Sequence, residues 1–173
     1  MQEKIKLLKL GVVILFSLLV LFGGCRYQWQ PPFPSSILKI AIPTFLNEKT
    51  FEYGLEETLT RLVEEEFILD GRLDIVEENE ADLILEGRID YYLKELLSGT
   101  AGAEEYRVRI GVVVSLISTG EKEVLEEAEE REIEEMTVYS LVRTIQTEDE
   151  AKNETCRKIG RELVRLIWEE WRG

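Results

Sequence analysis

LILEGRIDYYLKELL (residues 83–97) and EYRVRIGVVVSL (residues 105–116) carry apolar residues at nearly every second position. This alternation is typical of strands with one buried face. The small and polar residues Ser98–Gly102 between them predict a turn, so the two stretches form a long antiparallel hairpin. The side chains expected on its core face are Leu83, Leu85, Gly87, Ile89, Tyr91 and Leu93, then Tyr106, Val108, Ile110, Val112, Val114 and Leu116.

Two segments flanking the hairpin repeat apolar residues every three or four positions, which predicts amphipathic helices over 51–69 and 149–171. Asp70 and Gly71 end the first helix. Its expected core residues are Phe51, Leu55, Leu59, Leu62, Val63, Phe67 and Ile68, and those of the second are Ala151, Cys156, Ile159, Leu163, Leu166 and Ile167, with Trp168 and Trp171 near its end.

Three further strands complete the predicted sheet. Residues 37–43 and 73–76 form two short strands. Residues 121–135 are glutamate-rich and favour a helix by propensity, but their place after the turn at Thr119 and Gly120 favours an edge strand, which we choose. The expected fold class is α+β, with two helices on one face of a mostly antiparallel four- to five-stranded sheet and the other face open.

The first residues have the parts of a signal peptide. Three lysines precede an apolar run from Leu10 to Phe22, which is too short to span a bilayer permanently and ends in Gly-Gly-Cys25. That junction resembles the lipobox of bacterial lipoproteins, although Phe22 stands where Leu is usual. We expect cleavage after residue 24 and acylation of Cys25; the alternative is an uncleaved anchor with an ordinary buried cysteine.

The predicted organisation is a signal peptide (1–24), a lipidated proline-rich tether (25–36) and one α+β domain (37–173). Lipoproteins with Asp after the acylated cysteine are commonly retained in the inner membrane. Because Arg26 stands there, the resemblance implies a periplasm-facing protein of the outer membrane.

The charge of the mature chain argues against nucleic-acid binding. The full sequence has 21 basic and 35 acidic residues, and cleavage after residue 24 leaves 18 and 34, a net charge of −16. Binding to nucleic acid depends on cationic contacts to phosphate.

With Cys25 acylated, Cys156 is the one remaining cysteine, which excludes an intramolecular disulfide. We interpret it as a buried apolar residue.

Residues typical of catalysis or of metal and cofactor binding are missing from the sequence. It has no histidine, no nucleophile elbow, no phosphate-binding loop and no cysteine pair for zinc. Its glutamate runs lack the spacing of a calcium loop, so we interpret them as solvated faces. We therefore expect no enzyme activity, no metal site and no cofactor.

A basic cluster is the candidate binding site. If the turn sets the register, Arg88 and Lys94 lie across from Arg107 and Arg109 on the open face of the hairpin. Arginine can grip a phosphate through paired hydrogen bonds. The alternative is that these residues only form cross-strand ion pairs with Glu86 and Asp90.

The sequence resembles the LptE family of lipopolysaccharide-assembly lipoproteins over nearly all of the mature chain. The features that carry this resemblance are the lipobox, LKIAIPTFLN (38–47) with FEYGL (51–55), DGRL (70–73), Ala81-Asp82 before Glu86-Gly87, and Tyr106-Arg107-Val108. No single motif is specific, but their order and spacing together are.

The resemblance implies a non-enzymatic lipoprotein that helps to insert lipopolysaccharide into the outer membrane. It implies a place inside the lumen of a large β-barrel translocon of the LptD type, and it makes the basic cluster a candidate site for lipid A phosphates. A regulatory or structural lipoprotein, with a domain like those of curli-export or penicillin-binding-protein activator lipoproteins, remains the alternative. The identity of the co-purifying partner distinguishes the two.

Overall fold

The computed structural model of the chain describes residues 39–100, 103–119, 130–140 and 147–169. The predicted signal peptide, Cys25, the tether and Trp171 lie outside the described residues. In chain order the elements are β1 (Lys39–Ala41), α2 (Leu55–Asp70), β2 (Asp74–Ile75), a 3-10 turn η1 (Glu78–Glu80), β3 (Leu83–Thr100), β4 (Ala103–Ser118), β5 (Arg131–Ser140) and α3 (Glu148–Glu169).

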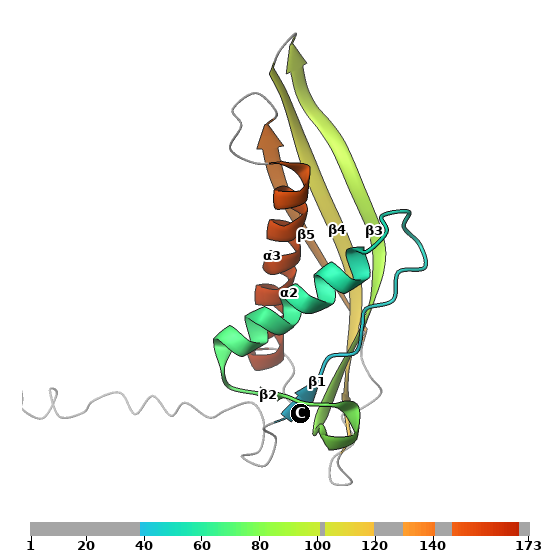
Figure 1. Cartoon of the computed structure of the whole chain (residues 1–173), viewed down its shortest axis with the longest axis vertical. Coiled ribbons are helices and arrows are strands. Elements are labelled where there is room, and N and C mark those ends of the chain that lie inside the picture. The colour runs from blue at the N-terminus through green and yellow to red at the C-terminus, as the bar shows by residue number, and fades with distance from the viewer. Residues whose placement is uncertain (1–38, 101–102, 120–129, 141–146, 170–173) are drawn as a thin grey trace, which may run out of the picture. The chain divides into compact units, whose positions relative to one another are not determined.

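The five strands form one sheet in the order β2-β1-β3-β4-β5. β3, β4 and β5 pair antiparallel, whereas β1 pairs parallel with both of its neighbours. Both helices lie on the same face of this sheet (Figure 1). The predicted α+β fold class, with two helices on one face of a mostly antiparallel sheet, is therefore confirmed.

The core lies between the two helices and the sheet. The predicted apolar faces of α3 and β4 are buried, except for the half-buried Tyr106, and Cys156 is a buried free thiol. α3 begins with a capping box, in which the Glu150 amide donates to Thr147 Oγ1 (3.2 Å) and the Thr147 amide donates to the Glu150 carboxylate (2.7 Å). Gly71 ends α2 with a positive φ of 68° and a hydrogen bond to the carbonyl of Phe67.

The predicted first helix began too early. α2 starts at Leu55 after Gly54, whose φ of 76° lies in the left-handed region, and Phe51 belongs to the preceding loop, where its side chain is exposed. Ile68, predicted to be buried, is also exposed at the end of α2. The three- and four-residue spacing of apolar residues thus continues, at both ends, beyond the residues of α2 that pack against the core.

The segment 121–135 is confirmed as a strand from Arg131 onward, and β5 continues to Ser140. Residues 120–129 lie outside the described residues. β5 alternates buried and exposed side chains, with Ile133, Thr137 and Tyr139 buried. Packing of this strand against α3 and β4 outweighs the helical propensity of its glutamates.

Candidate functional site

A β-bulge in β3 rearranges the predicted basic cluster. Ile89 pairs with Val112 and Tyr91 with Gly111, so Asp90 is an extra residue that has no partner in β4. After the bulge the two faces of β3 exchange. Tyr91 and Leu93, predicted to face the core, therefore lie on the sheet face opposite the helices, which we call the outer face.

The same bulge places Lys94 on the helix side, paired with the buried Val108. Its ammonium forms an ion pair with Glu148 at the start of α3 and lies 5.1 Å from the centre of the Tyr106 ring. The hydrogen bond with Glu148 raises the pKa of Lys94 and lowers that of Glu148. The prediction that Lys94 shares the open face with the arginines is thus wrong.

Arg107 and Arg109 lie on the outer face and share one carboxylate. Arg109 Nη2 donates to Glu95 Oε1 over 3.2 Å, and Arg107 Nε lies 3.4 Å from Glu95 Oε2. Glu134 of β5 is 3.7 Å from Arg109. Both guanidinium groups thus converge on Glu95, which the alternation of the sequence placed on the other face.

Several polar atoms of this arginine pair are only partly satisfied. The Nε atoms of Arg107 and Arg109 and Oε2 of Glu95 are shielded from solvent and have no hydrogen-bond partner among the described residues. The 3.4 Å contact between Arg107 Nε and Glu95 Oε2 is thus an ion pair without a hydrogen bond. Arginine guanidinium groups bind carboxylate and phosphate oxygens with the same paired geometry. A phosphate that displaced Glu95 would meet two converging donors, so we define Arg107, Arg109 and Glu95 as the arginine site.

Arg88 lies on the outer face but apart from the arginine site. It pairs in register with Val113, four residues along β4 from Arg109, rather than across from Arg107 or Arg109 as predicted. Its guanidinium donates twice to Glu130, over 2.7 and 3.0 Å, which raises the pKa of Arg88 and lowers that of Glu130. Ion pairing, the alternative interpretation of these arginines, therefore occurs, but with Glu130, Glu95 and Glu134 rather than with the predicted Glu86 and Asp90.

Apolar side chains surround the arginine site, which the sequence reasoning missed. Across β3, β4 and β5, one row of paired residues is Leu93, Arg109 and Met136. A neighbouring row on the same face is Glu95, Arg107 and Val138. Leu93, Met136 and Val138 are all exposed. No helix of the described residues covers this part of the outer face (Figure 1). Together these groups form a surface that offers both apolar contact and guanidinium groups to an acylated, phosphorylated ligand.

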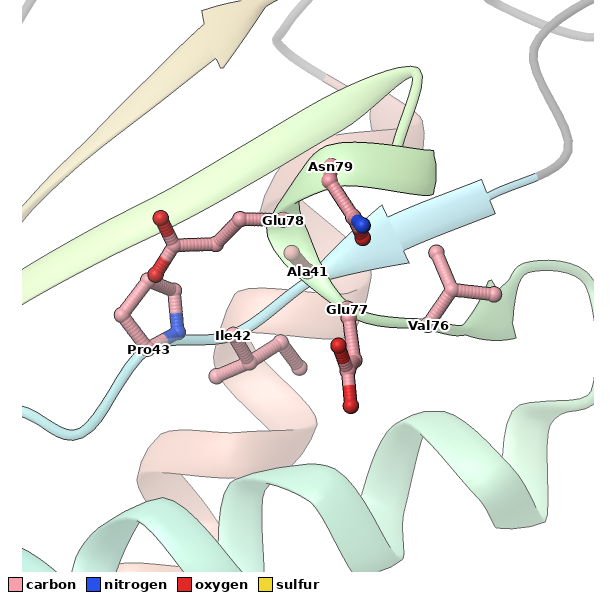
Figure 2. A pocket seen from close by; sticks show the side chains of 7 residues that line it. All are labelled: Ala41, Ile42, Pro43, Val76, Glu77, Glu78 and Asn79. Carbon is pink, nitrogen blue, oxygen red and sulfur yellow. The ribbon is translucent and has the colours of Figure 1, made fainter.

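A pocket of about 440 Å³ lies at the other end of the sheet, where β2 diverges from β1. Figure 2 shows it between Pro43, two residues after the end of β1, and the turn at η1, with Glu77 and Glu78 pointing to different sides. Its lining contains these two carboxylates and no basic residue, so it does not suit a phosphate.

The described residues contain neither a candidate membrane-spanning helix nor a candidate metal site. No helix there is long and apolar enough to cross a membrane. No group of three or more acidic, cysteine or histidine side chains is arranged to hold a metal ion in that part of the chain.

Comparison with solved structures gives a match at a TM-score of 0.50 and others below it. A Xanthomonas campestris protein of family DUF330 aligns with a TM-score of 0.50 at 11% identity, over 80% of this chain and 88% of its own. A minor lipoprotein of Acinetobacter baumannii aligns at 0.48 and 18% identity, over 75% and 91%. The rare lipoprotein B of Shewanella oneidensis aligns at 0.37 and 19% identity, over 75% and 89%. At such identities the Xanthomonas match speaks for the fold alone, and the two lower scores carry no argument.

Curated proteins give no match to this sequence. The lipopolysaccharide-assembly family model, LptE, matches residues 37–167, which include every described strand and nearly all of α3. That family consists of non-enzymatic lipoproteins that act with other components of lipopolysaccharide transport. The resemblance seen in the sequence is therefore confirmed, and the chain belongs to the LptE lipopolysaccharide-assembly family.

Proposed function

We propose that this protein is a non-enzymatic outer-membrane lipoprotein that supports a β-barrel translocon during lipopolysaccharide insertion. The observation that carries the proposal is the family match over residues 37–167. In this proposal the signal peptide (1–24) is cleaved, Cys25 is acylated, residues 25–36 tether the domain (37–173) to the membrane, and the protein faces the periplasm. The domain sits in the lumen of an LptD-like barrel.

The outer face of the sheet is the surface that would meet the lipid. Its arginine site supplies two guanidinium groups, and Leu93, Met136 and Val138 supply exposed apolar area beside them. Lipid A presents phosphates next to acyl chains, which these two kinds of group complement. Arg107 and Arg109 then exchange Glu95 for a phosphate, while Arg88 and Lys94 stay with their own carboxylates, Glu130 and Glu148.

The partner and the anchor are tested together in the outer membrane. Extraction in detergent followed by affinity purification of the full chain should recover one large β-barrel protein, and mass spectrometry should find an acylated N-terminal Cys25. Recovery with a peptidoglycan synthase or a secretion pore instead would favour the regulatory lipoprotein. An unmodified Met1 terminus would disprove the lipid anchor.

The arginine site is tested by charge reversal. Arg107→Glu with Arg109→Glu should weaken binding to purified lipopolysaccharide at least tenfold at fixed ionic strength, because four units of charge change beside the phosphates. Arg61→Glu with Arg165→Glu is the matched control, since both arginines are exposed on the helices and the charge change is the same. Equal losses in the two variants, or no loss in the first, would reject the site.

A further inference from the structure

The loop between β1 and α2 exposes two aromatic side chains almost completely. Phe51 is 92% exposed and Tyr53 is 93% exposed, the highest fractions for large apolar side chains among the described residues. Each such ring offers on the order of 150–250 Å² of contact area. We call residues 47–54 the aromatic loop.

Hydrogen bonds from Asn47 hold this loop in shape. Its side-chain amide donates to the Glu52 carbonyl (3.1 Å) and to the Glu56 carboxylate (2.8 Å). Its side-chain oxygen accepts from the Thr50 hydroxyl (2.8 Å). The bond from Asn47 is also the largest cause of the lowered pKa of Glu56. One amide thus closes the loop on itself and onto the first turn of α2.

Two ion pairs fix the loop to the rest of the domain. Lys152 of α3, whose side chain is only 16% exposed, lies 2.7 Å from the Glu52 carboxylate. Lys49 forms an ion pair with Asp90, the bulged residue of β3. The loop is therefore attached to a helix and to the sheet at points on either side of Phe51.

The exposure of the rings follows from this arrangement. Thr50 and Glu52 are half-buried and bonded to Asn47 and Lys152, while the alternate residues Phe51 and Tyr53 face solvent. A loosely held loop would let the rings fold back onto apolar surface, because burial of aromatic area is favourable. A loop that is tied down and still presents two rings is preorganised for binding.

The charge around the rings selects the kind of surface that the loop fits. Glu48 and Glu57 are exposed beside the rings, and the one lysine of the loop, Lys49, is paired with Asp90. Carboxylates at this position are repelled by an anionic membrane surface and are complementary to lysine or arginine. A second copy of the mature chain, with a net charge of −16, is also disfavoured.

We propose that Phe51 and Tyr53 are the anchor residues for the protein partner, and that they insert into an apolar pocket of the barrel wall bordered by lysine or arginine. This inference rests on the proposed function, because the partner is the barrel of that proposal. Aromatic anchors in desolvated pockets contribute most of the binding energy at many interfaces. The contact is made by the loop and leaves the outer face of the sheet free for lipid.

The test uses the full chain co-expressed with the barrel and purified from detergent-solubilised outer membrane. Phe51→Ser with Tyr53→Ser should lower recovery of the barrel at least tenfold and leave the melting temperature near that of the wild type. Ile68→Ser with Leu69→Ser is the matched control, because it removes two exposed apolar side chains from the end of α2 and should retain the barrel. Asn47→Ala, which releases the loop but keeps both rings, should give an intermediate loss.

Photo-crosslinking identifies the molecule that the aromatic loop binds. A benzophenone amino acid at position 51 should form an adduct with the barrel, and one at position 69 should not. Adducts at position 51 with lipid alone or with a second copy of this chain would overturn the inference, as would wild-type recovery of the barrel by the Phe51→Ser/Tyr53→Ser variant. If the wild-type chain recovers no barrel at all, the proposed function fails together with this inference, so the two failures are distinguishable.

Discussion

Replacement of Gly87 by alanine is expected to destabilise the domain because the space beside this residue is filled by an aromatic ring. A Cβ at position 87 would lie 2.2, 2.5 and 2.8 Å from Cε1, Cδ1 and Cζ of Phe45. Carbon atoms pack best at about 3.5–4.0 Å, so the ring would have to move by more than about 1 Å.

Phe45 has little freedom to make that movement. Its side chain is buried, and its amide donates to Thr60 Oγ1 over 3.0 Å. The next residue, Leu46, is hydrogen-bonded on both sides to β3, through the Gly87 carbonyl (2.9 Å) and the Ile89 amide (2.7 Å). Overpacking of this kind costs about 1–3 kcal/mol. Alanine recovers about 0.5–1 kcal/mol over glycine in a strand.

Contacts as short as 2.2 Å place the overpacking cost in the upper half of its range, about 2–3 kcal/mol. The expected net loss for Gly87→Ala is therefore about 1–2.5 kcal/mol in the free energy of unfolding, or about 3–10 °C in melting temperature. Urea titration followed by circular dichroism measures it. Gly99→Ala is the matched control on the same strand, since the nearest atom to its Cβ is Glu104 Cγ at 3.5 Å, an ordinary contact. The double variant Gly87→Ala/Phe45→Leu should lose less than the sum of the single changes. A Gly87→Ala protein as stable as the Gly99→Ala protein would refute the reasoning.

Two further predictions concern α3. Thr147→Ala removes the capping box with Glu150 and should cost about 1 kcal/mol of stability in the same urea titration; an unchanged midpoint would contradict the capping role. Burial raises the pKa of the Cys156 thiol to about 12, so in a Cys25→Ser chain at pH 8 it should react with a disulfide reagent only after unfolding. The unfolded thiol ionises above about pH 8.5 and the folded one does not, so stability should fall as pH rises from about 9 toward 12. Cys156→Val should weaken that fall, and rapid labelling of the folded protein would show that the thiol is accessible.

The periodicity of the sequence was sufficient to predict the two helices, the long hairpin and the common face on which the helices pack. Apolar residues at period two and at three- or four-residue spacing report directly which side of an element leaves water. The core side of α3 agrees with that pattern, and so does β4 from Val108 to Leu116, although Val113 on the opposite face is buried as well. The family motifs also have local physical reasons. Asn47 closes the loop before α2, and Gly87 leaves room for Phe45.

The composition of the candidate site depended on tertiary structure. Alternation cannot place Asp90, because a bulge inserts one residue and exchanges the faces of the residues from Tyr91 to Leu96, until a second irregularity before Ser98. Only the pairing of β3 with β4 reveals where this happens. Because of that exchange, the side chain of Lys94 faces α3 and forms an ion pair with Glu148, and the carboxylate of Glu95 contacts both Arg107 and Arg109. The exposure of Phe51 likewise depends on contacts with residues far along the chain, such as Lys152. The sequence by itself determined which elements form and which faces are apolar, since those follow from local spacing. Register and long-range ion pairs, which no local pattern encodes, decided which charged and aromatic groups meet.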